Sequence, residues 1–166
     1  MRAGIALGSN LGDRLENIRQ ARDRICALDE RRQPFLQSPV YETPPLGCEP
    51  GARTFYNAVL EIEFAGPADQ LLRELQEIER VLGRAPDHAR NVSRTIDLDL
   101  LYFGGEQRLT GELQLPHPRF AQREFVLRPL ADIVPELRLP GQAASVRELL
   151  ARIPAGDEIR CVTKTW

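Results

Sequence analysis

Residues 55–64 read Phe-Tyr-Asn-Ala-Val-Leu-Glu-Ile-Glu-Phe, and this stretch decides the fold. Successive side chains of a β-strand point to opposite faces, and here one face is apolar while the other carries polar groups. The alternation predicts a strand with one buried face and a second face that is free for other uses. We assign Tyr56, Ala58, Leu60, Ile62 and Phe64 to the apolar face, and Phe55, Asn57, Glu61 and Glu63 to the other.

Further strands and helices are predicted on both sides of this strand. Before it come an apolar run, a helical repeat with Asn10 or Asp13 as a candidate cap, and a second apolar run. After it, a helix opens at Gly66-Pro67 and closes at Gly83, and an alternating strand ends at Phe103. The predicted ranges are strands at 4–7, 36–41 and 95–103, helices at 11–28, 67–82, 125–133 and 146–153, and loops at 43–52 and 84–94.

This order of elements is strand, helix, strand, strand, helix, strand and then a tail. It predicts an α+β protein with the ferredoxin-like split βαβ sandwich, in which both helices cover one face of an antiparallel sheet. The other face would stay open and hold the functional site, and the tail would be a C-terminal extension. Because 166 residues contain no evident linker, we expect a single domain over residues 1–166.

Composition narrows the class of partner. With 28% charged residues and a net charge of −2, the chain has no broad basic surface for nucleic acid, and no stretch has the length of a membrane span. Three widely spaced cysteines without C-x-x-C spacing fit reduced thiols in the cytoplasm. Lys164 is the only lysine, so a Walker A loop is excluded, and phosphate would be bound by arginine, magnesium and backbone N–H groups.

Asp97 and Asp99 are the first candidates for chemistry. Both lie on one face of the strand predicted at 95–103, where two like charges repel unless a cation neutralises them. Mg²⁺ commonly takes one or two carboxylates together with substrate phosphates, so the pair predicts a magnesium site. The alternative is a solvated sheet face without a ligand.

Several other residue types could serve the same site. Arg84, Arg90 and Arg94 precede the aspartates and could bind phosphate, although a solvated arginine loop is the alternative. Glu79 falls at the edge of a buried helix stripe, as a site residue or as part of a structural ion pair. The stiff segment Thr43-Pro44-Pro45-Leu46-Gly47 could present backbone groups to a flat heterocycle, and Asn57 and Phe55 could contact the same ligand. A further cluster of candidate residues comprises His117, Arg119, Arg123 and Phe125.

These motifs, in this order, resemble the 6-hydroxymethyl-7,8-dihydropterin pyrophosphokinases of folate biosynthesis. The resemblance spans most of the chain, and the ordered set is far more specific than any single motif. It rests on Gly8-Ser9-Asn10-Leu11-Gly12, Tyr41-Glu42-Thr43-Pro44-Pro45, Phe55-Tyr56-Asn57-Ala58-Val59, Arg94-Thr95-Ile96-Asp97-Leu98-Asp99, Leu115-Pro116-His117-Pro118-Arg119 and Arg123-Glu124-Phe125-Val126-Leu127.

The resemblance implies a monomeric ferredoxin-like transferase that moves the terminal diphosphate of ATP onto the pterin hydroxymethyl group and releases AMP. It implies two Mg²⁺ ions held by Asp97 and Asp99, with Arg84 and Arg94 assisting the transfer. The implied pterin pocket comprises Thr43, Pro44, Pro45, Leu46, Phe55, Asn57 and Phe125, and the implied ATP site Gln76, Glu79, Arg84, Arg94, Leu100, His117 and Arg123.

Two rival functions differ from this one. A nucleotidyltransferase also combines Gly-Ser with a strand D-x-D, but its two motifs lie close together, whereas Ser9 and Asp97 are far apart. A ferredoxin-like binding or regulatory module is the rival from another class. An RNA-binding version would need aromatic-rich strands and a basic face, and the sequence has neither.

Overall fold

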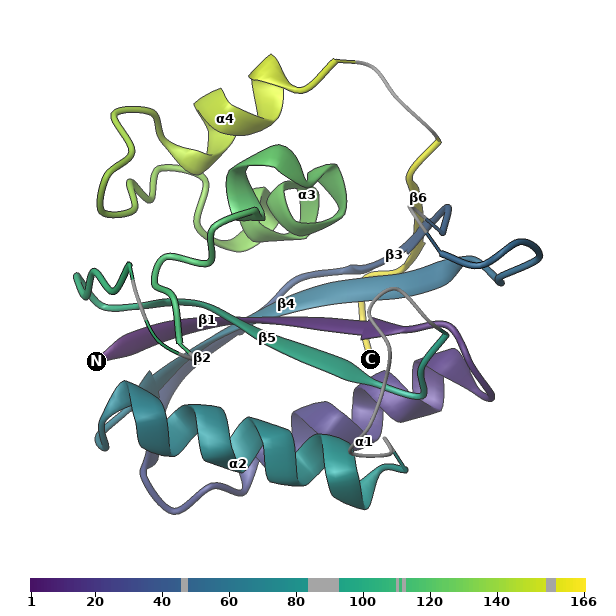
Figure 1. Ribbon diagram of the computed structural model, residues 1–166, viewed down its shortest axis with the longest axis horizontal. Helices are drawn as coiled ribbons and strands as arrows, with labels where there is room; N and C mark the ends of the chain where they lie inside the picture. The colour runs from purple at the N-terminus through teal and green to yellow at the C-terminus, as the bar shows by residue number, and fades with distance from the viewer. Residues whose placement is uncertain (46–47, 84–92, 110, 112, 155–157) are drawn as a thin grey trace.

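The computed structural model describes residues 1–45, 48–83, 93–109, 111, 113–154 and 158–166. In chain order the elements are β1 (Arg2–Ser9), α1 (Arg14–Cys26), β2 (Arg31–Gln37), β3 (Val40–Thr43), β4 (Phe55–Phe64), α2 (Ala68–Val81), β5 (Asp97–Phe103), the 3₁₀ turn η1 (Phe120–Gln122), α3 (Glu124–Ile133), α4 (Val146–Arg152) and β6 (Arg160–Thr163). The sheet has the strand order β5-β1-β4-β3-β6, with β2 also paired to β4, and helices lie on both sides of the sheet (Figure 1).

The strand β4 organises the sheet because it pairs along both of its edges. On one side it pairs with β1, in register from Arg2 opposite Glu63 to Ser9 opposite Tyr56. On the other side it pairs first with β2 and then with β3, and all these pairings are antiparallel. The predicted antiparallel α+β sandwich with split βαβ order is therefore confirmed.

The single strand predicted at 36–41 is wrong, since Ser38 and Pro39 divide it into β2 and β3. Proline has no N–H and cannot continue the ladder. The Ser38 hydroxyl accepts a hydrogen bond from the Val59 N–H at 2.9 Å, and the Ser38 N–H donates to the Val59 carbonyl at 2.9 Å. Both backbone groups of Val59 stay paired while the edge of the sheet bends.

One face of the sheet is covered by α1 and α2, as predicted (Figure 1). The apolar stripes of α1 and α2 pack there against the apolar face of β4 and exclude solvent. Full burial of one large apolar side chain stabilises the fold by about 1.5–3 kcal/mol. Of the two predicted cap candidates, Asn10 and Asp13, the structure has Asp13 as the cap of α1, and its carboxylate accepts the Glu16 N–H at 3.1 Å. The largest fully buried side chains of this core include Ile5, Leu7, Ile18, Ile25, Leu60, Ile62, Phe64, Leu71, Leu75 and Ile96.

The second face is not left fully open, which corrects the expectation from sequence. Figure 1 shows α3 and α4 stacked on this side, and α3 packs on β4. A second apolar core lies beneath them, and a shift in the β1–β5 register allows β5 to supply Leu101 and Tyr102 to it. The open part of the face is thereby reduced to one end of β5, β1 and β4. The second core comprises Val59, Leu101, Tyr102, Phe120, Val126, Leu127, Leu130, Leu139, Ala144, Val146 and Leu149.

The C-terminal extension completes the sheet. β6 pairs with β3, and the Trp166 side chain reaches back into the first core. Its indole N–H donates to the Ser38 carbonyl at 2.7 Å, beside the break between β2 and β3. Among the described residues no helix has both the length and the apolar character needed to cross a membrane.

A charged cluster around Glu42 connects the C-terminal extension to the sheet. We predict from it that the stability of the fold decreases in acid. Glu42 accepts hydrogen bonds from Arg14 at 3.0 Å, Thr54 at 2.8 Å and Arg160 at 2.5 Å. These donors, Thr54 first and then Arg160, lower the pKa of Glu42 from 4.5 to about 2. We expect Glu42→Gln to lower the free energy of unfolding by about 2 kcal/mol at pH 7, after allowance for solvent screening.

The direction of the Glu42 pKa shift determines how this stabilisation changes with pH. Because folding depresses the pKa, the stabilisation is complete above about pH 4.5 and is lost as pH falls through about 2. Urea unfolding should therefore show a difference in the free energy of unfolding between wild type and variant that decreases steadily below pH 4.5. Glu136→Gln, which breaks the exposed pair with Arg147, is the control and should change stability by less than about 0.5 kcal/mol. An equal loss in both variants, or a difference independent of pH, would contradict the assignment.

Candidate active site

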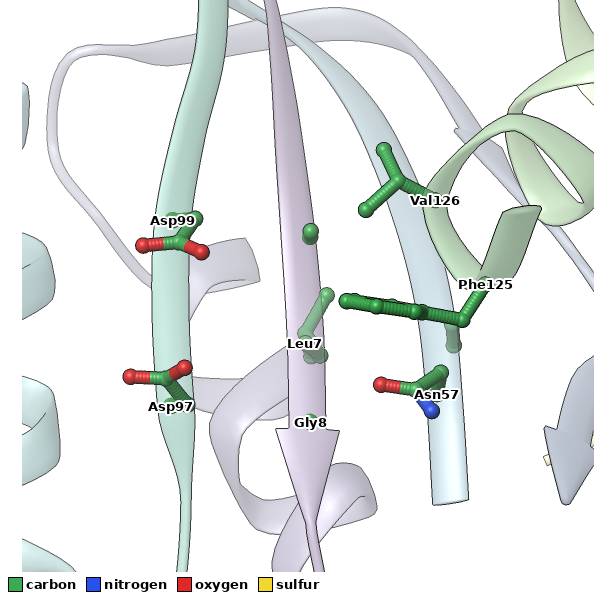
Figure 2. A pocket seen from close by; sticks show the side chains of 9 residues that line it. Leu7, Gly8, Asn57, Asp97, Asp99, Phe125 and Val126 are labelled. Atoms are coloured by element: carbon green, nitrogen blue, oxygen red, sulfur yellow. The ribbon is translucent and has the colours of Figure 1, made fainter. Parts of the chain in front are cut away.

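The open end of the second face has a floor of small residues on β1. Gly8 lies opposite Asp97 on β5 and opposite Asn57 on β4. A Cβ atom at Gly8 would stand 3.1 Å from Asn57 Oδ1 and 3.9 Å from Asp97 Cβ, so only glycine keeps this floor low. Figure 2 shows the pocket that results, lined by Ala6, Leu7, Gly8, Asn57, Ala58, Asp97, Asp99, Phe125 and Val126.

Asp97 and Asp99 form the β5 wall of this pocket, one above the other on the same face (Figure 2). Asp97 Oδ2 lies 2.9 Å from Arg94 Nη1, and Asp99 Oδ2 lies 3.5 Å from Arg123 Nη1. Burial, followed by the charge of Asp97, raises the pKa of Asp99 above its ordinary value. The pair therefore holds concentrated negative charge that a further cation would relieve.

The carboxylate pair fits magnesium. Mg²⁺ prefers oxygen ligands, keeps several waters and commonly uses one or two carboxylates rather than a cage made only of protein. Asp97 and Asp99 supply two carboxylates side by side, 25% and 36% exposed, which leaves room for water and phosphate. Within the described ranges no group of three or more His, Cys, Asp or Glu side chains is poised to hold a metal.

The wall of the pocket opposite the carboxylates carries groups that suit a flat polar molecule. Asn57 is buried at the β4 side, and its amide nitrogen donates to Thr43 Oγ1 at 2.7 Å. That bond leaves its carbonyl oxygen directed toward Gly8 and the pocket. The Phe125 ring projects from the start of α3 across the pocket, on the side of Asn57 (Figure 2). An amide that can both donate and accept, next to an aromatic face, suits a planar heterocycle.

Cations and a histidine approach from the segment before α3. The Arg123 guanidinium lies 5.4 Å from the Phe125 ring centroid. The backbone N–H of His117 donates to the Leu101 carbonyl at 2.8 Å. The imidazole Nδ1 accepts the backbone N–H of Arg119 at 3.2 Å, so a neutral His117 carries its ring proton on Nε2. Burial lowers the pKa of His117, while the charge of Asp99 opposes that shift. His117 and Arg123 thus stand beside the carboxylate pair, as donors for an anion.

Two candidates on α2 lie below the sheet rather than in the pocket. Glu79 is buried, and its Oε1 accepts the Leu98 N–H at 2.7 Å. This hydrogen bond gives a partner to the backbone N–H that lies between the two aspartates on the outer edge of β5. Gln76 is exposed on the same helix. The Leu100 side chain is buried in the first core, so only its backbone could meet a ligand.

Comparisons with known proteins identify the family of this chain. The family described as 7,8-dihydro-6-hydroxymethylpterin-pyrophosphokinase (HPPK) matches residues 4–135. The chain belongs to this family. A relative from Pseudomonas aeruginosa, named 2-amino-4-hydroxy-6-hydroxymethyldihydropteridine pyrophosphokinase, is 41% identical over 92% of this chain and 92% of its own length.

Two larger proteins are also similar to this HPPK-family chain. The folic acid synthesis protein FOL1 of Dictyostelium discoideum is 33% identical over 93% of this chain, which spans 23% of that protein. A crystal structure of Plasmodium falciparum HPPK-DHPS with pteroate superposes with a TM-score of 0.72. It covers 91% of this chain and 42% of its own at 14% identity, so it supports the fold alone.

Most of the predicted HPPK site residues that the structure describes converge. Asp97, Asp99, Asn57 and Phe125 line one pocket, Arg94 and Arg123 pair with its carboxylates, and Thr43 holds Asn57. Phe55 pairs with Thr43 where β3 meets β4, and Pro44 and Pro45 follow Thr43, half-buried. Leu46, Arg84 and Arg90 lie outside the described residues.

Sequence reasoning missed the role of Asn10, which it named only as a possible helix cap and as part of the motif Gly8-Ser9-Asn10-Leu11-Gly12. The side chain is fully buried and contacts Ser93 and Arg94, which lie far away in sequence. It also missed Gly8 as the floor of the pocket. A glycine and an asparagine shortly after the predicted apolar strand at 4–7 were the available signal, but the partners that explain them belong to other segments.

Proposed function

We propose that the protein transfers the terminal diphosphate of ATP to the hydroxymethyl group of 6-hydroxymethyl-7,8-dihydropterin, giving AMP and the pterin diphosphate in folate biosynthesis. The observation that supports this most directly is the composition of one pocket. A carboxylate pair with arginines lies at one wall, and a buried amide with an aromatic ring lies at the other. Those are the groups required to bind a metal-bound polyphosphate next to a planar heterocycle.

In this proposal Asp97 and Asp99 would hold two Mg²⁺ ions. Bound Mg²⁺ would neutralise phosphate charge and favour in-line attack by the hydroxyl group. The protein itself would supply Arg94, Arg123 and His117 as donors to phosphate oxygens, with Arg84 as a further candidate. Donors fixed in advance stabilise developing charge without reorganising during the reaction.

The pterin would occupy the pocket wall at Asn57 and Phe125. Phe55, Thr43, Pro44, Pro45 and Leu46 would complete this pocket by the family resemblance. The Asn57 carbonyl oxygen would accept from the heterocycle, and the second N–H of its amide would remain to donate, since Thr43 accepts only one of the two. Stacking on Phe125 would hold the ring flat, so that the hydroxymethyl group points toward the carboxylates.

ATP would lie toward the outer edge of β5. The Leu98 N–H faces away from β1, because it donates to Glu79. In an antiparallel strand the residue two positions on has the same orientation, so the backbone of Leu100 also faces the outer edge. The outward-facing backbone groups of Leu100 would meet a nucleobase, with Gln76 and Glu79 nearby on α2. We further propose that the protein acts as a monomer, since one chain supplies every proposed site residue. We also propose that it acts in the cytoplasm, since its three cysteines, all of them among the described residues, form no disulfide.

The test is to incubate the purified protein with ATP, Mg²⁺ and hydroxymethyldihydropterin and to identify the nucleotide product. AMP formation that depends on the pterin is the expected result. ADP would indicate an ordinary kinase instead. No turnover in the presence of saturable pterin binding would favour a ferredoxin-like binding module and overturn the proposal.

A further inference from the structure

Asn10 follows β1 and is completely buried, although it is polar. Its Oδ1 accepts the Arg94 N–H at 2.7 Å. Its Nδ2 donates to Ser93 Oγ at 2.9 Å and to the Arg53 carbonyl at 3.4 Å. One side chain therefore joins the turn after β1 to the segments that lead into β4 and into β5.

The main chain strengthens the link to Arg94. The N–H groups of Asn10 and Leu11 both donate to the Arg94 carbonyl, each at 3.2 Å. Both backbone polar groups of Arg94 are thus held by the same turn, its N–H by the Asn10 side chain and its carbonyl by the two N–H groups. A residue held in this way has little freedom to change the direction of its side chain.

The neighbours of Asn10 fix the orientation of its amide group. Ser93 Oγ donates to Glu49 Oε1 at 2.5 Å, because an ionised carboxylate can only accept. The serine oxygen then accepts the Asn10 N–H, and the Arg53 carbonyl accepts as well. Only the Asn10 oxygen can meet the Arg94 N–H. Both ends of the amide are therefore in use, which an apolar residue or a carboxylate could not reproduce.

The Arg94 guanidinium at the end of this chain of contacts is only partly engaged. Its Nη1 pairs with Asp97 at 2.9 Å, while its buried Nε has no hydrogen-bond partner among the described residues. Charge stabilisation by such a group depends on placing it before the reaction, and a displacement of about 1 Å can cost about 10²-fold in rate.

We propose that Asn10 is a positioning residue, which sets the direction of the Arg94 guanidinium toward the reacting phosphates. The inference rests on the proposed function, in which Arg94 stabilises the charge of the transferred group. Asn10 itself touches neither substrate. Its effect on turnover passes through Arg94.

The test is a double-mutant cycle between Asn10→Asp and Arg94→Ala, with kcat and KM measured at saturating Mg²⁺. The aspartate keeps the acceptor for the Arg94 N–H but removes both N–H donors. We expect Asn10→Asp alone to lower kcat by about tenfold or more, with both KM values changed by less than about threefold. In the Arg94→Ala background the same substitution should change kcat by less than about twofold.

Asn17→Asp is the matched control. Asn17 donates its amide to Ser9 Oγ at 3.2 Å and to the Leu11 carbonyl at 2.9 Å, in the same turn but without contact to residues 93 and 94. It should leave kcat within about twofold. If Asn10→Asp does not fold, Ser93→Ala removes one of the amide's partners, and its smaller loss in kcat should likewise vanish in the Arg94→Ala background.

The outcomes separate this inference from the function on which it rests. A wild-type protein that forms no AMP overturns the proposed function. An active wild type in which Asn10→Asp keeps full kcat, or loses the same factor with and without Arg94, overturns the positioning role. A loss that follows the melting temperature in both backgrounds would mean that Asn10 only stabilises the fold.

Discussion

Asp97→Asn or Asp99→Asn is expected to lower kcat by about 10³-fold or more while the protein remains folded. Both side chains line the pocket on the same wall, so each substitution removes half of the charge that would hold Mg²⁺. Asparagine keeps the size and one oxygen but lacks the charge. The loss therefore reports on cation binding rather than on packing.

Stability should move in the opposite direction to activity. Burial and the neighbouring charge of Asp97 raise the pKa of Asp99, which means that the ionised form is disfavoured in the fold. Asp99→Asn removes that unfavourable charge, and we expect a melting temperature no lower than that of the wild type without ligands. The Asp99 carboxylate then serves function at the expense of the stability of the unliganded fold.

The measurement combines steady-state kinetics with thermal unfolding in the presence and absence of Mg²⁺ and ATP. Wild type should gain thermal stability from the two ligands together, and neither variant should do so to the same extent. Asp23→Asn, in an exposed pair with Arg22, is the control and should retain full activity. Full turnover in Asp97→Asn or Asp99→Asn would rule out the metal assignment.

The alternation of apolar and polar residues along the strands predicted the main architecture and the part of the site that lies on β4 and β5. It placed Leu60, Ile62 and Phe64 under the helices, and Asn57, Asp97 and Asp99 on the other face, as observed. Alternation succeeds here because it depends only on the geometry of a single strand. It needs no knowledge of the partners.

The features that sequence analysis missed depend on distant partners. Alternation could not show that α3 and α4 cover much of the second face, since that depends on how the last third of the chain packs. Nor could it show that Ser38 would replace a ladder bond at the break before Pro39. The buried contacts of Asn10 join residues more than eighty positions apart, and no local pattern encodes such a pair.

Arg94→Ala is expected to lower kcat by about 10²–10³-fold with a smaller effect on both KM values, since removal of one fixed donor to developing charge has that magnitude. Arg94→Lys should recover only part of the loss. Lysine offers a point charge on a flexible chain, whereas the guanidinium presents several donors in a plane and can contact Asp97 and phosphate together. The Nε of Arg94 is one such donor, since it is buried and has no hydrogen-bond partner within the part of the chain that the structure describes.

Guanidinium ions provide the sharper measurement, because they can occupy the space left in Arg94→Ala. Millimolar guanidinium should raise kcat of that variant and leave Arg94→Lys and wild type unchanged. Arg147→Ala, which breaks only an exposed pair with Glu136, is the control and should keep wild-type kcat with or without the added ion. If Arg94→Ala keeps kcat within about threefold of wild type, Arg94 does not stabilise the transferred group, because a fixed donor to a developing charge cannot be removed at so small a loss of rate.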